Sequence, residues 1–202
     1  MIPQFIPKPR PLPPHRLDDM AKLAKHEVGH LIAAKIVGFP TGQITIQVDI
    51  RGGFVGGAEI TLPRSLRSVD DTKKYLRDRV IVLWAGALSE TLHGNMVDQE
   101  VACKTLNRPG ETDHPKAREL VNLLRNLTFP DAPAANVQEG LTALERELWS
   151  QTIDLVQGEA ALILGLAARL AGMVTTTSTL YTLSSVDIAR TPDVIKRFGA
   201  SA

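Results

Sequence analysis

The sequence predicts a mainly α-helical α+β domain with a small antiparallel β-sheet and a C-terminal helical pair. Only 4% of the 202 residues are aromatic, and leucine and alanine are frequent, a composition that favours helices over a large sheet. Apolar residues recur at helical spacing in several long segments, whereas only two short segments alternate as strands do. A chain of this length buries one good core, so one globular unit is expected.

Residues 1–16 form a proline-rich segment with only isolated apolar side chains. This composition predicts an extended N-terminal arm without a core of its own. Either a loosely held tail or an arm that binds a partner is compatible with it. We expect residues 17–202 to form the folded domain.

The clearest helix is predicted over residues 18–37. Apolar residues recur there near helical spacing, Asp18 or Asp19 can cap the start, and Gly38 followed by Pro40 ends the run. Residues 43–49 and 57–62 then alternate as strands do, with glycines between them. They predict a small antiparallel sheet.

A second long helix is predicted over residues 68–92, ending near Gly94. Residues 95–111 lack clear periodicity and are expected to form a loop. The next helix is predicted over residues 113–126, with Thr112 or Asp113 as its cap.

The C-terminal part of the chain is expected to be helical. Residues 137–157 and 159–173 predict the helical pair, and a short helix is expected near Val186. The most apolar stretch, residues 160–174, is about 15 residues long and contains Arg169, whereas a membrane span needs about 20 apolar residues. We expect a buried helix and no membrane insertion.

Charge and cysteine content narrow the classes of partner and compartment. The chain has 23 Lys and Arg against 22 Asp and Glu, a net charge of +1, which disfavours nucleic acid as a partner. Cys103 is the single cysteine, and no secretory signal opens the chain. We therefore expect a cytoplasmic protein.

The motif His26-Glu27-Val28-Gly29-His30 lies within the first predicted helix. Histidines four residues apart share a helix face, so both rings can bind one metal ion, while Glu27 can act as general base on a metal-activated water. The alternative is two ordinary exposed histidines on a packed helix. Gly29 is costly inside a helix, and its presence indicates close packing beneath the site.

A catalytic zinc ion needs a third protein ligand, since it typically keeps its fourth position for water. Spacing alone leaves the choice open among six residues: Glu90, His93, Asp98, Glu100, Asp113 and His114.

The chain resembles the peptidase domain of the FtsH family of ATP-dependent zinc metalloproteases. The family's HEAGH helix resembles HEVGHLIAAKI here, and a Gly-Gly before a strand ending in Thr-Leu-Pro follows in order. The family's LLGGRxAEEL resembles residues 83–92, its GAxNDLxRATELAR segment resembles residues 110–125, and its LDGEEI resembles LSSVDI near the C-terminus. The similarity spans about residues 20–190 and implies a helical metallopeptidase domain.

This resemblance implies that Asp113 is the third zinc ligand, beside His26 and His30. Glu90 is then an alternative ligand or a partner that orients a histidine. The sequence contains no GxxxxGK[ST] phosphate-binding loop, and no transmembrane anchor is expected. Substrates would be peptides or unfolded proteins, with a separate ATPase or adaptor as a further partner.

The leading hypothesis is an ATP-independent zinc endopeptidase with Glu27 as base. An exposed edge strand could align the substrate by strand addition, through Gly57, Ala58, Glu59, Ile60, Thr61 and Leu62. A second hypothesis is a catalytically silent, peptidase-derived module that binds metal and a protein partner. A third is metal-assisted hydrolysis of a substrate other than a peptide.

Overall fold

The computed structural model describes residues 8–49, 51, 53–108, 112–131, 133 and 136–199. The helical elements are η1 (Pro14–Arg16), α1 (Leu17–Val37), α2 (Val69–Glu90), α3 (Gln99–Leu106), α4 (Asp113–Thr128), α5 (Val137–Gly158), α6 (Ala160–Met173), α7 (Ser185–Ala189) and α8 (Pro192–Phe198). The strands are β1 (Thr41–Val48), β2 (Phe54–Ile60) and β3 (Leu180–Leu183). The mainly helical α+β class, the small antiparallel sheet and the C-terminal pair α5 and α6 are confirmed.

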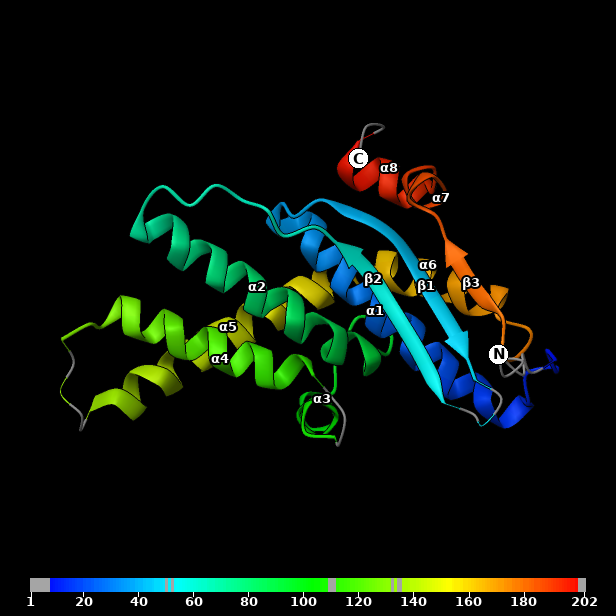
Figure 1. Cartoon of the computed structure of the whole chain (residues 1–202), viewed down its shortest axis with the longest axis horizontal. Coiled ribbons are helices and arrows are strands. Elements are labelled where there is room, and N and C mark those ends of the chain that lie inside the picture. Colours follow the sequence, from blue (N-terminus) through cyan, green and yellow to red (C-terminus); the bar gives the residue numbers. More distant parts are fainter. Residues whose placement is uncertain are drawn as a thin grey trace, which may run out of the picture.

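Helix α1 lies at the centre of the molecule (Figure 1) and packs against α2, α6 and β2. It ends as predicted at Gly38, whose φ of 85° is readily adopted only by glycine. It begins at Leu17, one residue before the predicted start, and the predicted cap is wrong, because the N-cap residue is Arg16 and no side chain caps the helix. Asp18 and Asp19 instead occupy the first turn, where their charge favours the helix dipole.

The sheet is antiparallel with the strand order β2-β1-β3, so β2 lies at one edge. Strand β2 begins at Phe54, three residues before the predicted start, because residues 54–57 pair with β1. It ends at Ile60, so Thr61 and Leu62 of the predicted strand follow it rather than belong to it. Strand β3 was not predicted, since four residues are too few to show alternation.

Two short helices correct the sequence prediction. The predicted loop over residues 95–111 contains α3, which is capped by Asp98 accepting a 3.0 Å hydrogen bond from the backbone N–H of Val101. Eight residues are about two turns, too short for an apolar period to stand out. Near the C-terminus, α7 confirms the helix expected around Val186, and α8 follows it unpredicted.

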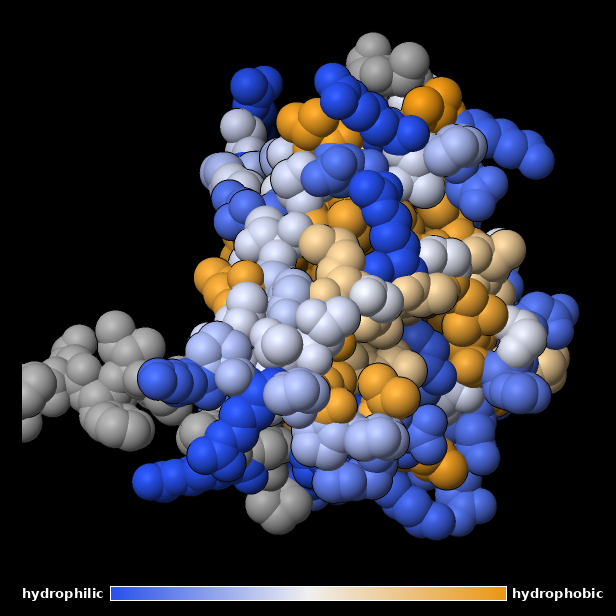
Figure 2. All heavy atoms as spheres, turned by 90° about the vertical axis from the view of Figure 1, so that its right-hand side faces the viewer, coloured by the Kyte–Doolittle hydropathy of each residue, from blue (hydrophilic) through white to orange (hydrophobic). Residues whose placement is uncertain are grey.

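The buried side chains form two clusters that share helix α2. One cluster joins α1, the sheet and α6, and the other lies between α2, α4 and α5. No single helix in the described ranges is both long and apolar enough to cross a membrane, and α5 with α6 reaches that length only as a pair bent by 68°. On the face shown in Figure 2, exposed apolar side chains are interspersed among hydrophilic ones.

Part of the predicted N-terminal arm is ordered against the domain. Residues 1–7 lie outside the described residues. Beyond them, the Leu12 N–H donates to the Thr175 carbonyl at 2.8 Å, and the Thr177 N–H donates to the Arg10 carbonyl at 2.8 Å. The described part of the arm therefore pairs with the segment that precedes β3.

Candidate metal centre

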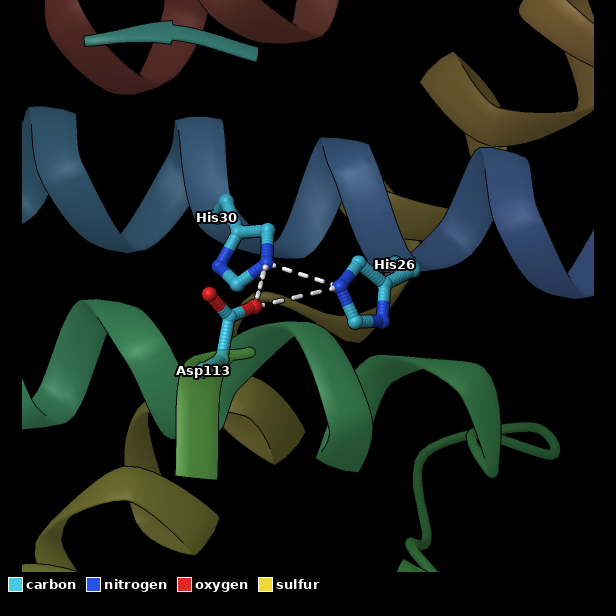
Figure 3. A group of neighbouring side chains, drawn as sticks. All are labelled: His26, His30 and Asp113. Carbon is cyan, nitrogen blue, oxygen red and sulfur yellow. Dashed lines mark hydrogen bonds and ion pairs between the residues drawn. The ribbon is translucent and has the colours of Figure 1, made fainter. Parts of the chain in front are cut away.

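Helix α1 places His26 and His30 one turn apart on the same face, and both are buried, with 8% of each residue exposed. Figure 3 shows the two rings turning toward each other and toward Asp113, the first residue of α4. The alternative of two exposed histidines is therefore wrong. Buried polar side chains require partners, and the two histidines find them in each other and in the half-buried Asp113.

The three side chains bring their ligand atoms close together. The Nε2 atoms of His26 and His30 are 2.8 Å apart, and Asp113 Oδ2 lies 2.9 Å from His30 Nε2 and 3.5 Å from His26 Nε2. All the ligand atoms lie within 4.8 Å of one another. The group could therefore hold a metal ion.

The second ring nitrogen of each histidine, Nδ1, forms a hydrogen bond within the protein. The Nδ1–H of His26 donates to Glu90 Oε1 at 2.8 Å, and the Nδ1–H of His30 donates to the Val82 carbonyl at 2.7 Å. These bonds fix the tautomer and orient the rings, so that both Nε2 lone pairs point at the same space. Glu90 thus lies beside His26 as an orienting partner.

Two lone pairs and a carboxylate that converge favour a positive charge between them. Burial alone would lower the pKa of His26, but hydrogen bonds with Asp113 and Glu90 outweigh burial and hold its pKa above the usual range. Burial alone would raise the pKa of Asp113, but its hydrogen bonds with the two histidines, which donate when their rings are protonated, hold the pKa of Asp113 below its usual range. A proton on His26 or a bound cation satisfies the same arrangement.

The residues fit a small divalent cation. Two imidazole nitrogens and a carboxylate oxygen match the ligands that zinc takes, at about 2.0–2.2 Å each. Ligands at that distance in a tetrahedral arrangement lie about 3.4 Å from one another. The 2.8, 2.9 and 3.5 Å separations reach this spacing with side-chain shifts smaller than an ångström.

Two glycines allow α1 and α2 to approach closely at the site. A Cβ atom added to Gly86 would lie 2.4 Å from His30 Nε2 and 2.9 Å from His26 Nε2. A Cβ atom added to Gly29 would lie 2.6 Å from the Cβ of Ser89 and 2.7 Å from the Ala85 carbonyl oxygen. The close packing predicted from Gly29 is therefore confirmed.

Glu27 is buried against β2, next to the histidines. A Cβ atom on Gly56 would lie 2.7 Å from Glu27 Oε1 and 3.0 Å from its Cγ, so the glycine leaves room for this side chain. Glu27, both histidines and Asp113 line one cavity of about 750 Å³, together with most of β2. The carboxylate is thus positioned beside the candidate metal site without belonging to it.

Strand β2 forms one wall of this cavity. It is the edge strand, and its outer edge has no strand partner among the described residues. In Figure 1 it is the strand of the sheet that lies on the side of α2. Of the predicted substrate strand, Gly57, Ala58, Ile60 and Leu62 line the cavity.

The structure separates the six candidates for a third ligand. Only Glu90 and Asp113 reach the histidines. Asp98 caps α3, and Glu100 pairs with Lys104 at 2.6 Å. The backbone of His93 pairs with that of Met96, and His114 lines a different cavity beside Trp84.

Sequence reasoning missed three groups of the site. Gly86 carries the same signal that singled out Gly29, a glycine inside a helix, and could have been found by it. Gly56 was recognised only as one of the glycines between or opening the strands and as part of the Gly-Gly in the family resemblance, without a role at the site. The Val82 carbonyl could not have been found, since a backbone acceptor leaves no trace in the residue type.

Comparison of the chain with models of known protein families finds no match, and comparison with curated proteins finds no relative. The likeness to FtsH-family peptidases therefore stays a prediction, carried by its motifs and their order. The candidate metal centre rests on the convergence of His26, His30 and Asp113 in the structure.

Proposed function

We propose that this protein is a zinc metallopeptidase that hydrolyses peptide bonds in peptides or unfolded protein segments without consuming ATP. The observation that carries the proposal is the convergence of His26, His30 and Asp113 beside the buried carboxylate of Glu27. A metal-binding group with three protein ligands and an adjacent base is the arrangement of catalytic rather than structural zinc sites, which usually have four protein ligands.

Zinc is the metal that this donor set suits best, because imidazole and carboxylate groups together are common ligands of catalytic zinc. When bound, the ion lowers the pKa of a water molecule to about 7 and polarises the substrate carbonyl. His26 and His30 would hold the ion through Nε2, while Glu90 and the Val82 carbonyl keep the rings oriented.

Glu27 is the general base in this proposal. Its carboxylate accepts the proton of the attacking water and then donates it to the leaving amine. Gly56 keeps the space that the carboxylate occupies, so Glu27 stays beside the metal ligands. Burial of Glu27 behind β2 limits competing contacts with solvent.

The edge of β2 supports a binding mode for the substrate. A peptide in extended conformation adds to an unpaired strand edge through main-chain hydrogen bonds, largely independent of its sequence. Because β2 lines the cavity that contains Glu27, a peptide paired with it would pass the reactive groups. We propose that this edge aligns the scissile bond.

We further propose that the domain is a peptidase of the FtsH type. The ordered motifs support this assignment, and Asp113, selected through the resemblance, lies next to both histidines. A separate ATPase or adaptor that delivers unfolded substrate, in the cytoplasm, is the partner that such a peptidase would use.

Metal content and cleavage of unfolded casein, measured for the wild type and two variants, test the proposal. Glu27→Gln keeps the shape of the side chain but removes the base, so it should retain zinc and lose at least about 100-fold in kcat. Asp113→Ala removes a ligand and should weaken zinc binding. Cleavage that survives Glu27→Gln would contradict the mechanism, and a zinc-loaded wild type that cuts nothing, with or without an ATPase, would favour the silent binding module.

A further inference from the structure

Arg79 lies in the wall of the cavity that contains the metal-binding group. It belongs to α2, three residues before Val82, whose carbonyl orients His30. One helical turn spans about 5.4 Å, and an extended peptide advances about 3.3 Å per residue. Arg79 therefore begins about one helical turn from the residue that orients His30, a length that an extended peptide covers in about two residues.

The guanidinium of Arg79 forms no ion pair with an acidic residue in the part of the chain that the structure describes, whereas Arg64, which lies over the same aromatic ring, does. Arg64 lies 4.2 Å from the centre of the Phe39 ring, forms an ion pair with Asp78, and donates to the Val37 carbonyl at 2.7 Å. Arg79 lies 5.9 Å from the same ring centre, and its guanidinium has no ion pair or hydrogen bond with the described residues. Arg64 thus has an acidic partner as well as the Phe39 ring, whereas the Arg79 guanidinium has the ring alone among these described contacts.

Among the described residues, none of the three cavity carboxylates, Glu27, Glu90 and Asp113, forms an ion pair with Arg79, although the charge of Asp113 attracts its guanidinium. Glu90 bonds His26 and lies 3.2 Å from Arg108, and Asp113 contacts both histidines. Burial lowers the pKa of Arg79, which shows that its charge is partly removed from water. A partly desolvated guanidinium gains most from a carboxylate that can accept two parallel hydrogen bonds.

We propose that Arg79 binds an acidic side chain of the substrate, so that the peptidase prefers Asp or Glu within about two residues of the scissile bond. This inference rests on the proposed function. Apolar side chains line the same cavity as Arg79, among them Ile60, Val82 and Leu83. They exclude water from the ion pair, which strengthens it.

The test uses the zinc-loaded protein and a set of fluorogenic peptides with blocked ends, so that side chains carry the only carboxylates. A single Glu is moved through the positions around the cleaved bond, and each peptide has a twin with Gln at the same place. We expect at least one position at which Glu raises kcat/KM about 10-fold over Gln, mostly through a lower KM. Equal values for every pair would overturn the inference and leave the proposed function standing.

Two substitutions of Arg79 test whether this residue causes the preference for Glu peptides. Arg79→Gln should abolish it, and Arg79→Glu should reverse it in favour of peptides with Lys at that position. Arg77→Gln is the matched control, because Arg77 lies on the same helix but pairs with Glu147 at 2.6 Å, outside the cavity. A misfolded variant cannot gain a preference for Lys, so the reversal separates recognition from damage. A preference that persists in Arg79→Gln would overturn the assignment.

Peptide binding to the Glu27→Gln variant, measured by fluorescence anisotropy, separates failure of this inference from failure of the proposed function. If Glu peptides bind more tightly than Gln peptides, and this difference is lost when Arg79 is also replaced, Arg79 recognises the acidic side chain. This conclusion holds even if the wild type cleaves none of the peptides. Cleavage by the wild type without this difference in binding would support the peptidase and overturn the role of Arg79.

Discussion

Among single residues, Glu27 has a carboxylate whose position is set by two elements, α1 and β2. Helix α1 sets its backbone one residue after His26, and β2 confines its side chain at Gly56. The contact at Gly56 involves the flexible end of Glu27, so added bulk there would move the carboxylate at little cost to the fold. A larger side chain at position 56 should therefore reduce catalytic activity more than it reduces the stability of the fold.

Replacing Gly56 by alanine tests this directly. The new Cβ would displace the Glu27 carboxylate, and we expect a loss of about 100-fold in kcat/KM with zinc content and melting temperature nearly unchanged. Gly57→Ala is the control, since its Cβ would meet nothing closer than Thr45 Oγ1 at 3.9 Å. Equal activities of the two variants would show that Glu27 is not held by β2.

Glu90 should influence zinc affinity through His26. Removing the carboxylate in Glu90→Ala frees the Nδ1–H of His26, and loss of such an orienting bond typically weakens metal binding about 10- to 100-fold. Competition with a zinc chelator measures the affinity. Complete loss of zinc would instead indicate that Glu90 is itself a ligand, whereas unchanged affinity would deny it any part in the site.

At the scale of elements, the contact between α1 and α2 positions the histidines. Gly29→Ala would press a Cβ against the Ala85 backbone, which cannot rotate away, and we expect destabilisation by about 1–3 kcal/mol from overpacking. Gly165→Ala, in α6 with open space around it, should stabilise the helix by about 0.5–1 kcal/mol. Urea denaturation measures both. The same sign for the two variants would refute close packing at Gly29.

The sequence predicted the long elements better than the short ones, for a physical reason. Helices α1 and α2 contain 21 and 22 residues, enough for the apolar period to repeat several times. Strand β3 has four residues and exists because it pairs with β1, about 135 residues earlier in the chain, a contact that local pattern does not encode. The eight residues of α3 are held by the Asp98 cap and a few buried side chains.

In the whole molecule, the site is assembled from α1, α2, α4 and β2. Local sequence could predict the pair His26 and His30 because both lie on one helix. It could not choose Asp113, since the approach of α4 to α1 depends on the packing of α2 between α4 and the rest of the core. The resemblance to a family, not spacing, selected Asp113, and the structure places it 2.9 Å from His30 Nε2.

Tyr181 of strand β3 forms hydrogen bonds with residues 175 and 176, which precede the strand. Burial alone would raise the pKa of Tyr181, but hydrogen bonds to its oxygen from Thr175 and Thr176 outweigh burial and lower the pKa to about 8. The backbone N–H of Thr176 donates at 3.0 Å and that of Thr175 at 3.3 Å. The chain contains two tyrosines, so absorbance at alkaline pH should show one ionising near pH 8, a step that is absent in Tyr181→Phe.

This shift also predicts the direction in which stability depends on pH. The folded-state pKa of Tyr181 lies below its unfolded value, so its contribution is present in full above about pH 10 and is lost as pH falls through about 8. Relative to Tyr181→Phe, the wild type should gain stability between these values. Parallel stability curves for the two proteins across this range would contradict the prediction.

The central claim is that His26, His30 and Asp113 bind zinc. The most direct measurement is an anomalous difference map at the zinc absorption edge from crystals of the zinc-loaded protein. The predicted result is one peak about 2.0–2.2 Å from Nε2 of both histidines and from the Asp113 carboxylate, with Glu27 beyond bonding distance. No peak at the three residues, or a peak bound by Glu27, would contradict the claim.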